Sequence, residues 1–291
     1  MSQALKGTPF TFLFSVYNEG NLTDFDTTPT LTVTDAAGAT VSTGALVNST
    51  TGVYQATITA QTNVAELSAR LVGNISGNAT TLTQDVSIVG NLVFTEAEAR
   101  AFDDARLNSF TDAQISEARE RVTNMFEEYC NVSFVPRYAR VKFSGANRRD
   151  AWLLSPLRGI RLDGGAGYGR EIQTLLGATD NTTAVSTANV EVYESGFRLT
   201  SGSWTWPTTS NPFPQTLAYE YGYASVPLDI KQAALILARH ELSVKDVTDR
   251  MISYQDALGG VRLSTPGPNR PTGLPVVDET LNRYRRREVV L

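Results

Sequence analysis

The sequence predicts two structural units, an all-β sandwich over residues 1–90 and an α+β unit over residues 95–291 in which helices flank β-hairpins. Three observations predict this division. Apolar and polar residues alternate through the first 90 residues. Two helix-capping sequences then begin at Thr95 and Thr111, and a helical apolar stripe follows the second. With 291 residues, the chain is also longer than one typical domain.

The first 90 residues carry the two-residue period of half-buried strands. The residues that share a strand face are Phe10, Phe12, Phe14 and Val16, then Leu31 and Val33, then Tyr54, Ala56 and Ile58, and last Val86 and Ile88. Turn sequences rich in Gly, Asn, Asp and Thr separate these runs at 18–21, 35–38 and 48–52. This spacing predicts an immunoglobulin-like sandwich without the cysteines and tryptophan of antibody domains. We expect it mainly to pack, and its loops leave a binding role open.

The pattern changes near Asn91, and we expect residues 91–94 to form a linker. Thr95 to Glu98 and Thr111 to Gln114 each have the form of a capping box. In such a box, the first side chain accepts a bond from an unpaired helical N–H and the fourth reaches back. The residues that recur at three- and four-residue steps after the second box are Ile115, Ala118, Val122, Phe126 and Tyr129. Those that fall outside this stripe are Glu117, Glu120, Arg121 and Glu127.

The remainder of the chain mixes strand-like runs with helices. The strand-like runs are 137–143, 151–154, 159–162, 171–176, 190–193 and 216–221. Pro227 precedes a second predicted helix from about Leu228 to Val247. The Gly- and Pro-rich stretch 259–275 cannot continue a helix, and a last helix is predicted from near Pro275 through Tyr284. Helices beside hairpins indicate an α+β unit.

Composition excludes several classes of function. The formal net charge of −5 gives no basic face for a strong nucleic-acid binder. A single cysteine, Cys130, rules out disulfides within the chain. The first residues lack the pattern of a signal peptide, and no stretch approaches the roughly 20 apolar residues that cross a bilayer. We therefore expect a protein made in the cytoplasm, with no membrane partner.

The residues that could carry chemistry do not cluster. His240 is the only histidine, and no further His or Cys stands at metal-ligand spacing. No Gly-x-Ser-x-Gly sequence offers a nucleophile to pair with it, so we expect it on a helix surface or at an interface. Cys130 ends an amphipathic helix without a partner histidine nearby in sequence, and we expect it to act as a buried small apolar residue.

One glycine-rich segment imitates a phosphate-binding loop. It contains Gly164, Gly165, Gly167 and Gly169 but lacks the Lys-Ser/Thr ending, and a strand-like run follows it. A nucleotide loop needs a helix there to point its N–H groups at phosphate, so we interpret the segment as a hairpin tip. Taken with His240 and Cys130, this predicts no enzyme activity, no metal and no cofactor.

Two segments suit interactions with other proteins. Trp204, Trp206 and Phe213 lie in an aromatic, proline-rich loop, which either folds back on its own unit or forms a subunit interface. The end of the chain carries Arg283, Arg285, Arg286 and Arg287, just before Val289, Val290 and Leu291. These cations could simply offset a helix dipole, or the segment could dock into an acidic partner groove. DNA binding is a third interpretation, which the acidic chain disfavours.

Residues 95–291 resemble the head-to-tail adaptor (connector) proteins of long-tailed phages, particularly those that infect actinobacteria. The segments that carry the resemblance are, in order, 130–137, 153–156 with 158–160, 219–223 with Pro227, 233–239, 266–267 with 271–278, and Leu281 and Tyr284 with the arginines. Their order and spacing are specific together, although none is diagnostic alone. The first 90 residues lie outside this pattern and look like the immunoglobulin-like domains that phages append to virion proteins.

The resemblance implies a structural role at the virion neck. Adaptors of this family form a ring of about twelve copies, closed by heterologous contacts. The ring docks on the portal protein, extends the channel through which genomic DNA passes without sequence-specific binding, and meets a tail-side connector, stopper or tail terminator protein. An acidic protein fits a channel that must release DNA. The family's portal-engaging element corresponds here to Arg283, Tyr284, Arg285, Arg286, Arg287, Val289, Val290 and Leu291. The alternative function is a carbohydrate- or surface-binding virion module acting through the sandwich.

Overall fold

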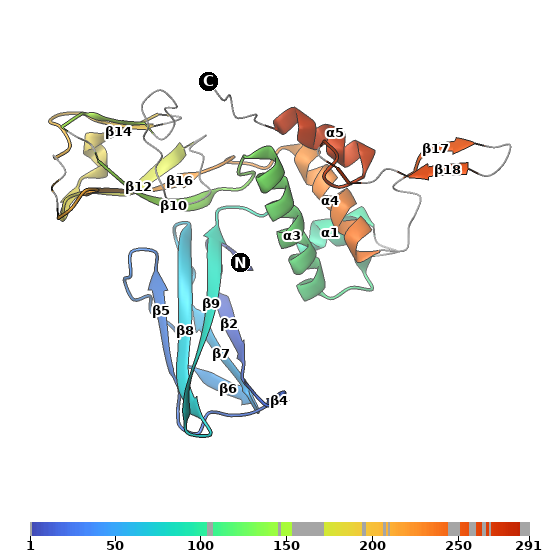
Figure 1. Ribbon diagram of the computed structural model, residues 1–291, viewed down its shortest axis with the longest axis horizontal. Coiled ribbons are helices and arrows are strands. Elements are labelled where there is room, and N and C mark those ends of the chain that lie inside the picture. Colours follow the sequence, from blue (N-terminus) through green and yellow to red (C-terminus); the bar gives the residue numbers. More distant parts are fainter. Residues whose placement is uncertain are drawn as a thin grey trace.

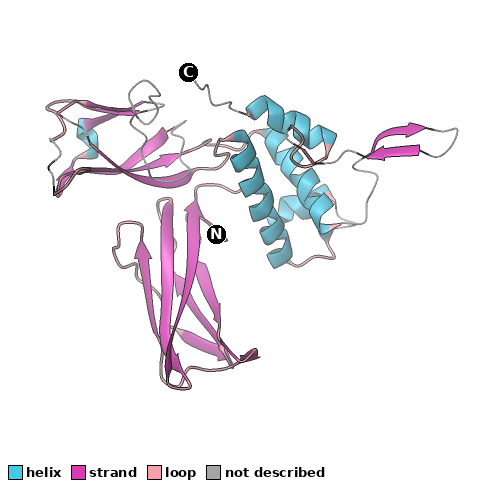
Figure 2. Cartoon of the chain, in the orientation of Figure 1, coloured by secondary structure: helices cyan, strands magenta, loops and turns pink. Residues whose placement is uncertain are grey.

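The computed structural model describes residues 2–103, 107–144, 147–152, 172–193, 196–205, 208, 210–243, 251–255, 260–263, 266–267 and 269–285. These residues form several sheets and four α-helices. Figure 1 shows the helices gathered in the middle of the molecule, with one group of strands below them and another to one side. Figure 2 shows that strands dominate both outer groups. This arrangement agrees with a sandwich joined to an α+β unit.

The N-terminal group of strands consists of two facing sheets. The first has the order β1-β9-β8-β5 and contains β1 (Ser2–Leu5), β9 (Asn78–Val89), β8 (Ala65–Ile75) and β5 (Thr30–Asp35). The second has the order β2-β7-β6 and contains β2 (Phe10–Ser15), β7 (Val53–Ile58) and β6 (Val47–Thr50). A small ribbon pairs β3 (Tyr17–Asn18) with β4 (Asn21–Leu22).

The alternating residues that the sequence singled out form the sandwich core. Phe12 and Phe14 of β2 pack with Val86 and Ile88 of β9 from the opposite sheet. Strands β1 and β8 were not predicted, although β8 is the central strand between β9 and β5. Its buried face combines two leucines with Ala69, whose small side chain weakens the apolar alternation. The immunoglobulin-like topology stays a prediction.

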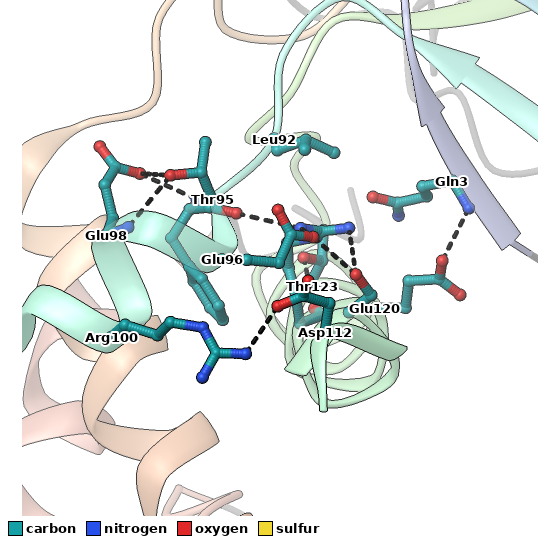
Figure 3. Close-up of polar contacts among 12 residues, drawn as sticks. Gln3, Leu92, Thr95, Glu96, Glu98, Arg100, Asp112, Glu120 and Thr123 are labelled. Carbon is teal, nitrogen blue, oxygen red and sulfur yellow. Dashed lines mark hydrogen bonds and ion pairs between the residues drawn. The ribbon is translucent and has the colours of Figure 1, made fainter. Parts of the chain in front are cut away.

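The helices begin where the capping sequences predicted. α1 (Glu96–Phe102) and α3 (Asp112–Cys130) both start with complete capping boxes. At the first, the N–H of Glu98 donates to Thr95 Oγ1 at 3.2 Å and the N–H of Thr95 donates to Glu98 Oε2 at 2.9 Å (Figure 3). The predicted stripe of α3 is confirmed, since its first four members are fully buried and Tyr129 packs beside them.

Two features of this helical region differ from the expectation. Residues 91–94, the expected linker, place Val93 and Phe94 in the helical core, where both are buried. Arg119, which was not singled out, is also buried on α3. Its Nη1 donates to Glu96 Oε1 at 2.6 Å and to the Phe94 carbonyl at 3.4 Å, so it ties the start of α1 to α3.

Two later helices complete the core. α4 (Leu228–Leu242) starts as predicted but ends five residues before the expected Val247, because Ser243 has left the helical conformation. Residues 244–250 lie outside the described residues. α5 (Pro275–Tyr284) has the predicted bounds, with proline at its first position, where no N–H is needed.

The remaining strands form a second sheet group. One sheet orders β10 (Arg137–Phe143), β16 (Gln215–Tyr221), β12 (Ile172–Asp180) and β13 (Thr183–Val185), and the other orders β11 (Asp150–Trp152), β15 (Gly196–Leu199) and β14 (Val190–Tyr193). A 3-10 turn (Thr187–Asn189) precedes β14. The hairpin of β17 (Met251–Gln255) and β18 (Gly260–Leu263) projects from the helices and was not predicted (Figure 1). The predicted strand 159–162 and the four glycines from Gly164 to Gly169 lie outside the described residues.

Candidate functional site: the C-terminal anchor

The predicted docking segment begins on α5, whose buried face holds it against the other helices. Val277 and Leu281 are completely buried in the core that α3 and α4 share. The start of α5 is tied down as well, because Asp278 Oδ1 accepts hydrogen bonds from the N–H of Thr272 at 3.0 Å and from Thr272 Oγ1 at 2.8 Å. The start of this short helix therefore has a fixed position, and the contacts of Tyr284 and Arg285 fix its end.

Tyr284, the last helical residue of α5, completes a cluster of three aromatic rings. Its ring lies edge-on to Phe134 at 5.6 Å and to Tyr223 at 6.3 Å, and Phe134 and Tyr223 stack at 5.9 Å between centroids. The Tyr284 hydroxyl donates to Asp229 Oδ1 at 2.8 Å. Desolvation and this carboxylate raise the pKa of Tyr284 to about 12. Tyr284 therefore joins the segments that follow α3 and β16 to the start of α4.

Arg285 fixes the point at which the chain leaves α5. Its guanidinium lies over the ring of Tyr129, 4.8 Å from the centroid, and its Nη1 donates to Asn269 Oδ1 at 3.0 Å. The Tyr129 hydroxyl donates to Asn282 Oδ1 at 2.6 Å, which brings α3 and α5 together. We call Tyr284, Arg285 and the residues around them the C-terminal anchor. Its other members are Tyr129, Phe134, Tyr223, Asp229, Asn269 and Asn282.

The predicted docking residues thus fall into three groups. Arg283 is exposed and pairs with Glu279 on its own helix at 3.0 Å. Tyr284 and Arg285 have partners within the chain, and their docking role stays a prediction. The others, Arg286, Arg287, Val289, Val290 and Leu291, lie outside the described residues.

The candidate interface residues also separate. Trp204 is 0% exposed and packs edge-on against Phe143 at 5.3 Å, inside the second sheet group. Its side chain has no surface to offer a neighbour, so the structure corrects its assignment as an interface residue in favour of a segment folded back on its own unit. Phe213 is 58% exposed and can reach a partner. Trp206 lies outside the described residues.

The residues weighed for chemistry take structural positions. His240 is buried on α4, so of its two expected positions, a helix surface or an interface, the structure contradicts the helix surface. Cys130 is completely buried as expected, and its thiol donates to the Leu281 carbonyl at 3.4 Å. Desolvation raises the pKa of Cys130 to about 12. Among the described residues, no group of three or more His, Cys, Asp and Glu side chains could hold a metal ion.

Sequence reasoning missed the polar partners of the anchor. Tyr129 was recognised only for its apolar ring, since its place in the helical stripe says nothing of its hydroxyl. Asn269, Asn282 and Asp229 were not singled out. The spacing of Asn282 and Arg285 puts both on one side of α5, which is the one local signal that could have found them.

No helix in the described part of the chain is long and apolar enough to cross a membrane.

Comparisons with known proteins include a distant structural likeness. No protein-family model matches the chain, and no curated protein matches it. Among solved structures, a chain from a structure described as "Virion of native gene transfer agent (GTA) particle" aligns with 68% of this chain and 92% of its own length. The TM-score is 0.41 and the sequence identity 14%, which is too distant to assign a fold or a function.

Proposed function

We propose that this chain is a non-enzymatic structural protein of a phage virion, the adaptor subunit that forms a ring between portal and tail. The observation that carries the proposal is the aromatic cluster of the C-terminal anchor. Phe134, Tyr223 and Tyr284 come from three separate adaptor-like segments, and their rings meet within 6.3 Å. Three segments that resemble adaptor proteins in sequence therefore pack against one another, which supports an adaptor-like fold.

The anchor supports a docking role for the segment that follows it. Because Arg285 is held on Tyr129, the arginines beyond it start from a fixed place on the body of the protein. Arginine forks bind carboxylates in a bidentate way, so Arg286 and Arg287 suit an acidic groove on the portal. The apolar end, from Val289 to Leu291, would then fill the apolar part of that groove.

The ring requires a different surface on each side of a subunit, because heterologous contacts close it. Phe213 is the described exposed aromatic residue of the candidate interface loop, and we propose it for one of these contacts. The genome would pass through the ring without sequence-specific binding, for which the net charge of −5 is suitable.

The test is assembly with the portal protein encoded in the same genome. A chain truncated after Arg285 keeps the whole anchor and removes only residues 286–291, so we expect it to fold normally and to lose portal binding. A second variant, Arg286→Glu with Arg287→Glu, should bind at least about tenfold more weakly if the groove is acidic. Rings visible by negative stain on wild-type complexes would support the proposal. Unimpaired portal binding by the truncated chain would show that residues 286–291 are not the docking segment.

A second candidate function, recognition of a carbohydrate or cell surface by the sandwich, has one observation in its favour. Tyr17 and Leu22 pair across the β3–β4 ribbon at the end of the sandwich farthest from the helices (Figure 1). They are 60% and 44% exposed, and an exposed tyrosine ring is a common platform for ligands. A glycan array probed with the full chain, with Tyr17→Ala as control, would detect such binding. Equal signals from the wild type and Tyr17→Ala would exclude the β3–β4 ribbon as the binding site.

A further inference from the structure

The sandwich and the rest of the chain meet along a built interface. We call residues 91–285 the body. Figure 1 shows the upper end of the sandwich meeting α3 and β10. The connection itself is short and packed, because β9 ends at Val89 and Val93 is already buried in the helical core. So short and packed a connection allows little hinge motion between the sandwich and the body.

Three separate places on the sandwich are hydrogen-bonded to the body. The N–H of Gln3 in β1 donates to Glu120 Oε1 on α3 at 2.8 Å (Figure 3). The N–H of Gly90 donates to the Pro136 carbonyl at 2.9 Å. Arg140 Nη1 of β10 donates to the carbonyl of Ala36, in the turn after β5, at 3.2 Å. Contacts at three points that do not lie on one strand oppose rotation about any single axis.

Gly90 also shows how closely the two parts approach. A Cβ atom built on Gly90 would lie 2.7 Å from Pro136 Cβ, 2.9 Å from Pro136 Cγ and 3.2 Å from Glu220 Oε1. Real Cβ atoms do not approach carbon that closely, so any larger residue here would push the sandwich away from the body. Position 90 is therefore a steric probe of the docked arrangement.

Arg137, the first residue of β10, directly follows Pro136, the residue that Gly90 contacts. Its Nε is 2.8 Å from Glu127 Oε2 of α3, and both side chains are largely buried. Arg137 also acts electrostatically on Glu66 of β8, in the sandwich, where it opposes the rise in pKa that desolvation causes. A second pair, Lys6 Nζ and Glu220 Oε1 at 3.7 Å, spans the same interface.

Glu127 is equally well fixed from the body side. Its Oε1 accepts hydrogen bonds from Ser133 Oγ at 3.0 Å and from the N–H of Phe134 at 3.1 Å. The guanidinium of Arg137 is therefore placed by α3 and the segment after it. Because Arg137 directly follows Pro136, whose carbonyl accepts the bond from the N–H of Gly90, its pair with Glu127 holds the docking point of the sandwich in place.

We propose that Arg137 is a positioning residue that holds the sandwich on the body, so that the two move as one rigid piece. The sandwich is then a fixed extension of the body rather than a tethered module that searches for ligand. This inference does not depend on the adaptor function, because it concerns contacts within a single chain.

Amide hydrogen exchange on the full chain tests the proposal directly. The Gln3 and Gly90 amides donate across the interface, so they report on docking. Amides of the β8–β9 ladder and of α3 report on the folding of each part. In Arg137→Met we expect exchange at Gln3 and Gly90 to accelerate by about tenfold or more, with the two sets of internal amides unchanged. Arg137→Lys should lie between this variant and the wild type.

Two further variants keep the test decisive if Arg137→Met disturbs folding of the body. Gly90→Ala acts sterically and Lys6→Met removes the cation that pairs with Glu220 across the interface, and both should accelerate exchange at Gln3. Arg121→Met is the matched control, since Arg121 pairs at 2.7 Å with Glu117 and at 3.2 Å with Glu241 within the helices. Unprotected Gln3 and Gly90 amides in the wild type would overturn rigid docking. Unchanged exchange in a folded Arg137→Met protein would overturn the role of Arg137.

Discussion

Arg285 lies over the ring of Tyr129, with its guanidinium carbon 4.8 Å from the ring centroid. The two residues are far apart in the sequence, since Tyr129 belongs to the last turn of α3 and Arg285 caps α5. Arg285 also donates to Asn269 Oδ1, so its side chain is held on two sides. This contact makes Arg285 part of the folded structure, whereas the neighbouring Arg283 is exposed and pairs with Glu279 of its own helix.

The first prediction compares these two arginines. Arg285→Ala should lower the free energy of unfolding by about 1 kcal/mol, because it removes a cation–π contact and a hydrogen bond. Arg283→Ala should change it by less than about 0.5 kcal/mol, because it removes only an exposed pair with Glu279. Urea unfolding of both variants measures the difference. Equal losses would show that the Tyr129 contact does not stabilise the fold.

The second prediction concerns the hydroxyl of Tyr284. Tyr284→Phe keeps the aromatic cluster but removes the hydrogen bond to Asp229, and we expect it to cost about 1 kcal/mol of stability. Tyr284→Ala also removes the ring from Phe134 and Tyr223 and should cost about 2–4 kcal/mol. Denaturant titrations compare the two. A Phe variant as destabilised as the Ala variant would place the stabilisation in the hydroxyl alone.

The third prediction concerns the reactivity of Cys130. Burial raises its pKa to about 12, so at pH 8 almost none of the thiol is in the reactive thiolate form. We expect a thiol-specific reagent such as DTNB to label the native protein only at the rate of unfolding, and the protein in urea at once. Labelling that is fast without denaturant, and that disappears in Cys130→Ser, would contradict the buried position.

The fourth prediction follows from the raised pKa of Glu127, which desolvation shifts above its ordinary value of 4.5. The folded chain therefore binds a proton at Glu127 at a higher pH than the unfolded chain does. By linkage, the contribution of Glu127 to stability rises as pH falls through the folded pKa, is fully present below 4.5 and is lost at higher pH. Urea midpoints from pH 8 to 4.5 should thus move in favour of the wild type relative to Glu127→Gln. A constant difference between the two would contradict this prediction.

The same residue shows where the sequence was informative and where it was not. Local patterns predicted both capping boxes and the stripe of α3, because these depend on neighbours within one or two turns. Glu127 falls outside the stripe, yet Arg137 and the segment after α3 bury it, and no local pattern encodes that contact. The expected linker shows the same dependence on distant contacts, since its residues Val93 and Phe94 find their partners in distant helices.

The candidate site was predicted in part for a similar reason. The composition of the last residues identified the basic segment, but only the fold shows that Tyr284 and Arg285 have partners on α3 and α4. The loop tryptophan is a further case. Aromatic residues are enriched both in cores and at interfaces, so composition alone could not separate Trp204 from Phe213.

The last prediction uses that pair. Trp204→Ala should destabilise the folded chain by about 3–5 kcal/mol, because it empties a fully buried position beside Phe143. Phe213→Ser should leave the thermal midpoint of the isolated chain within about 2 °C of wild type, because its ring is mostly in solvent. If Phe213 forms a subunit contact, the same variant should nevertheless weaken self-assembly, which size-exclusion chromatography or mass photometry at rising concentration would detect. Wild-type assembly by Phe213→Ser would exclude the ring contact proposed for that residue, whereas loss of assembly in a protein of unchanged stability would separate an interface role from a folding defect.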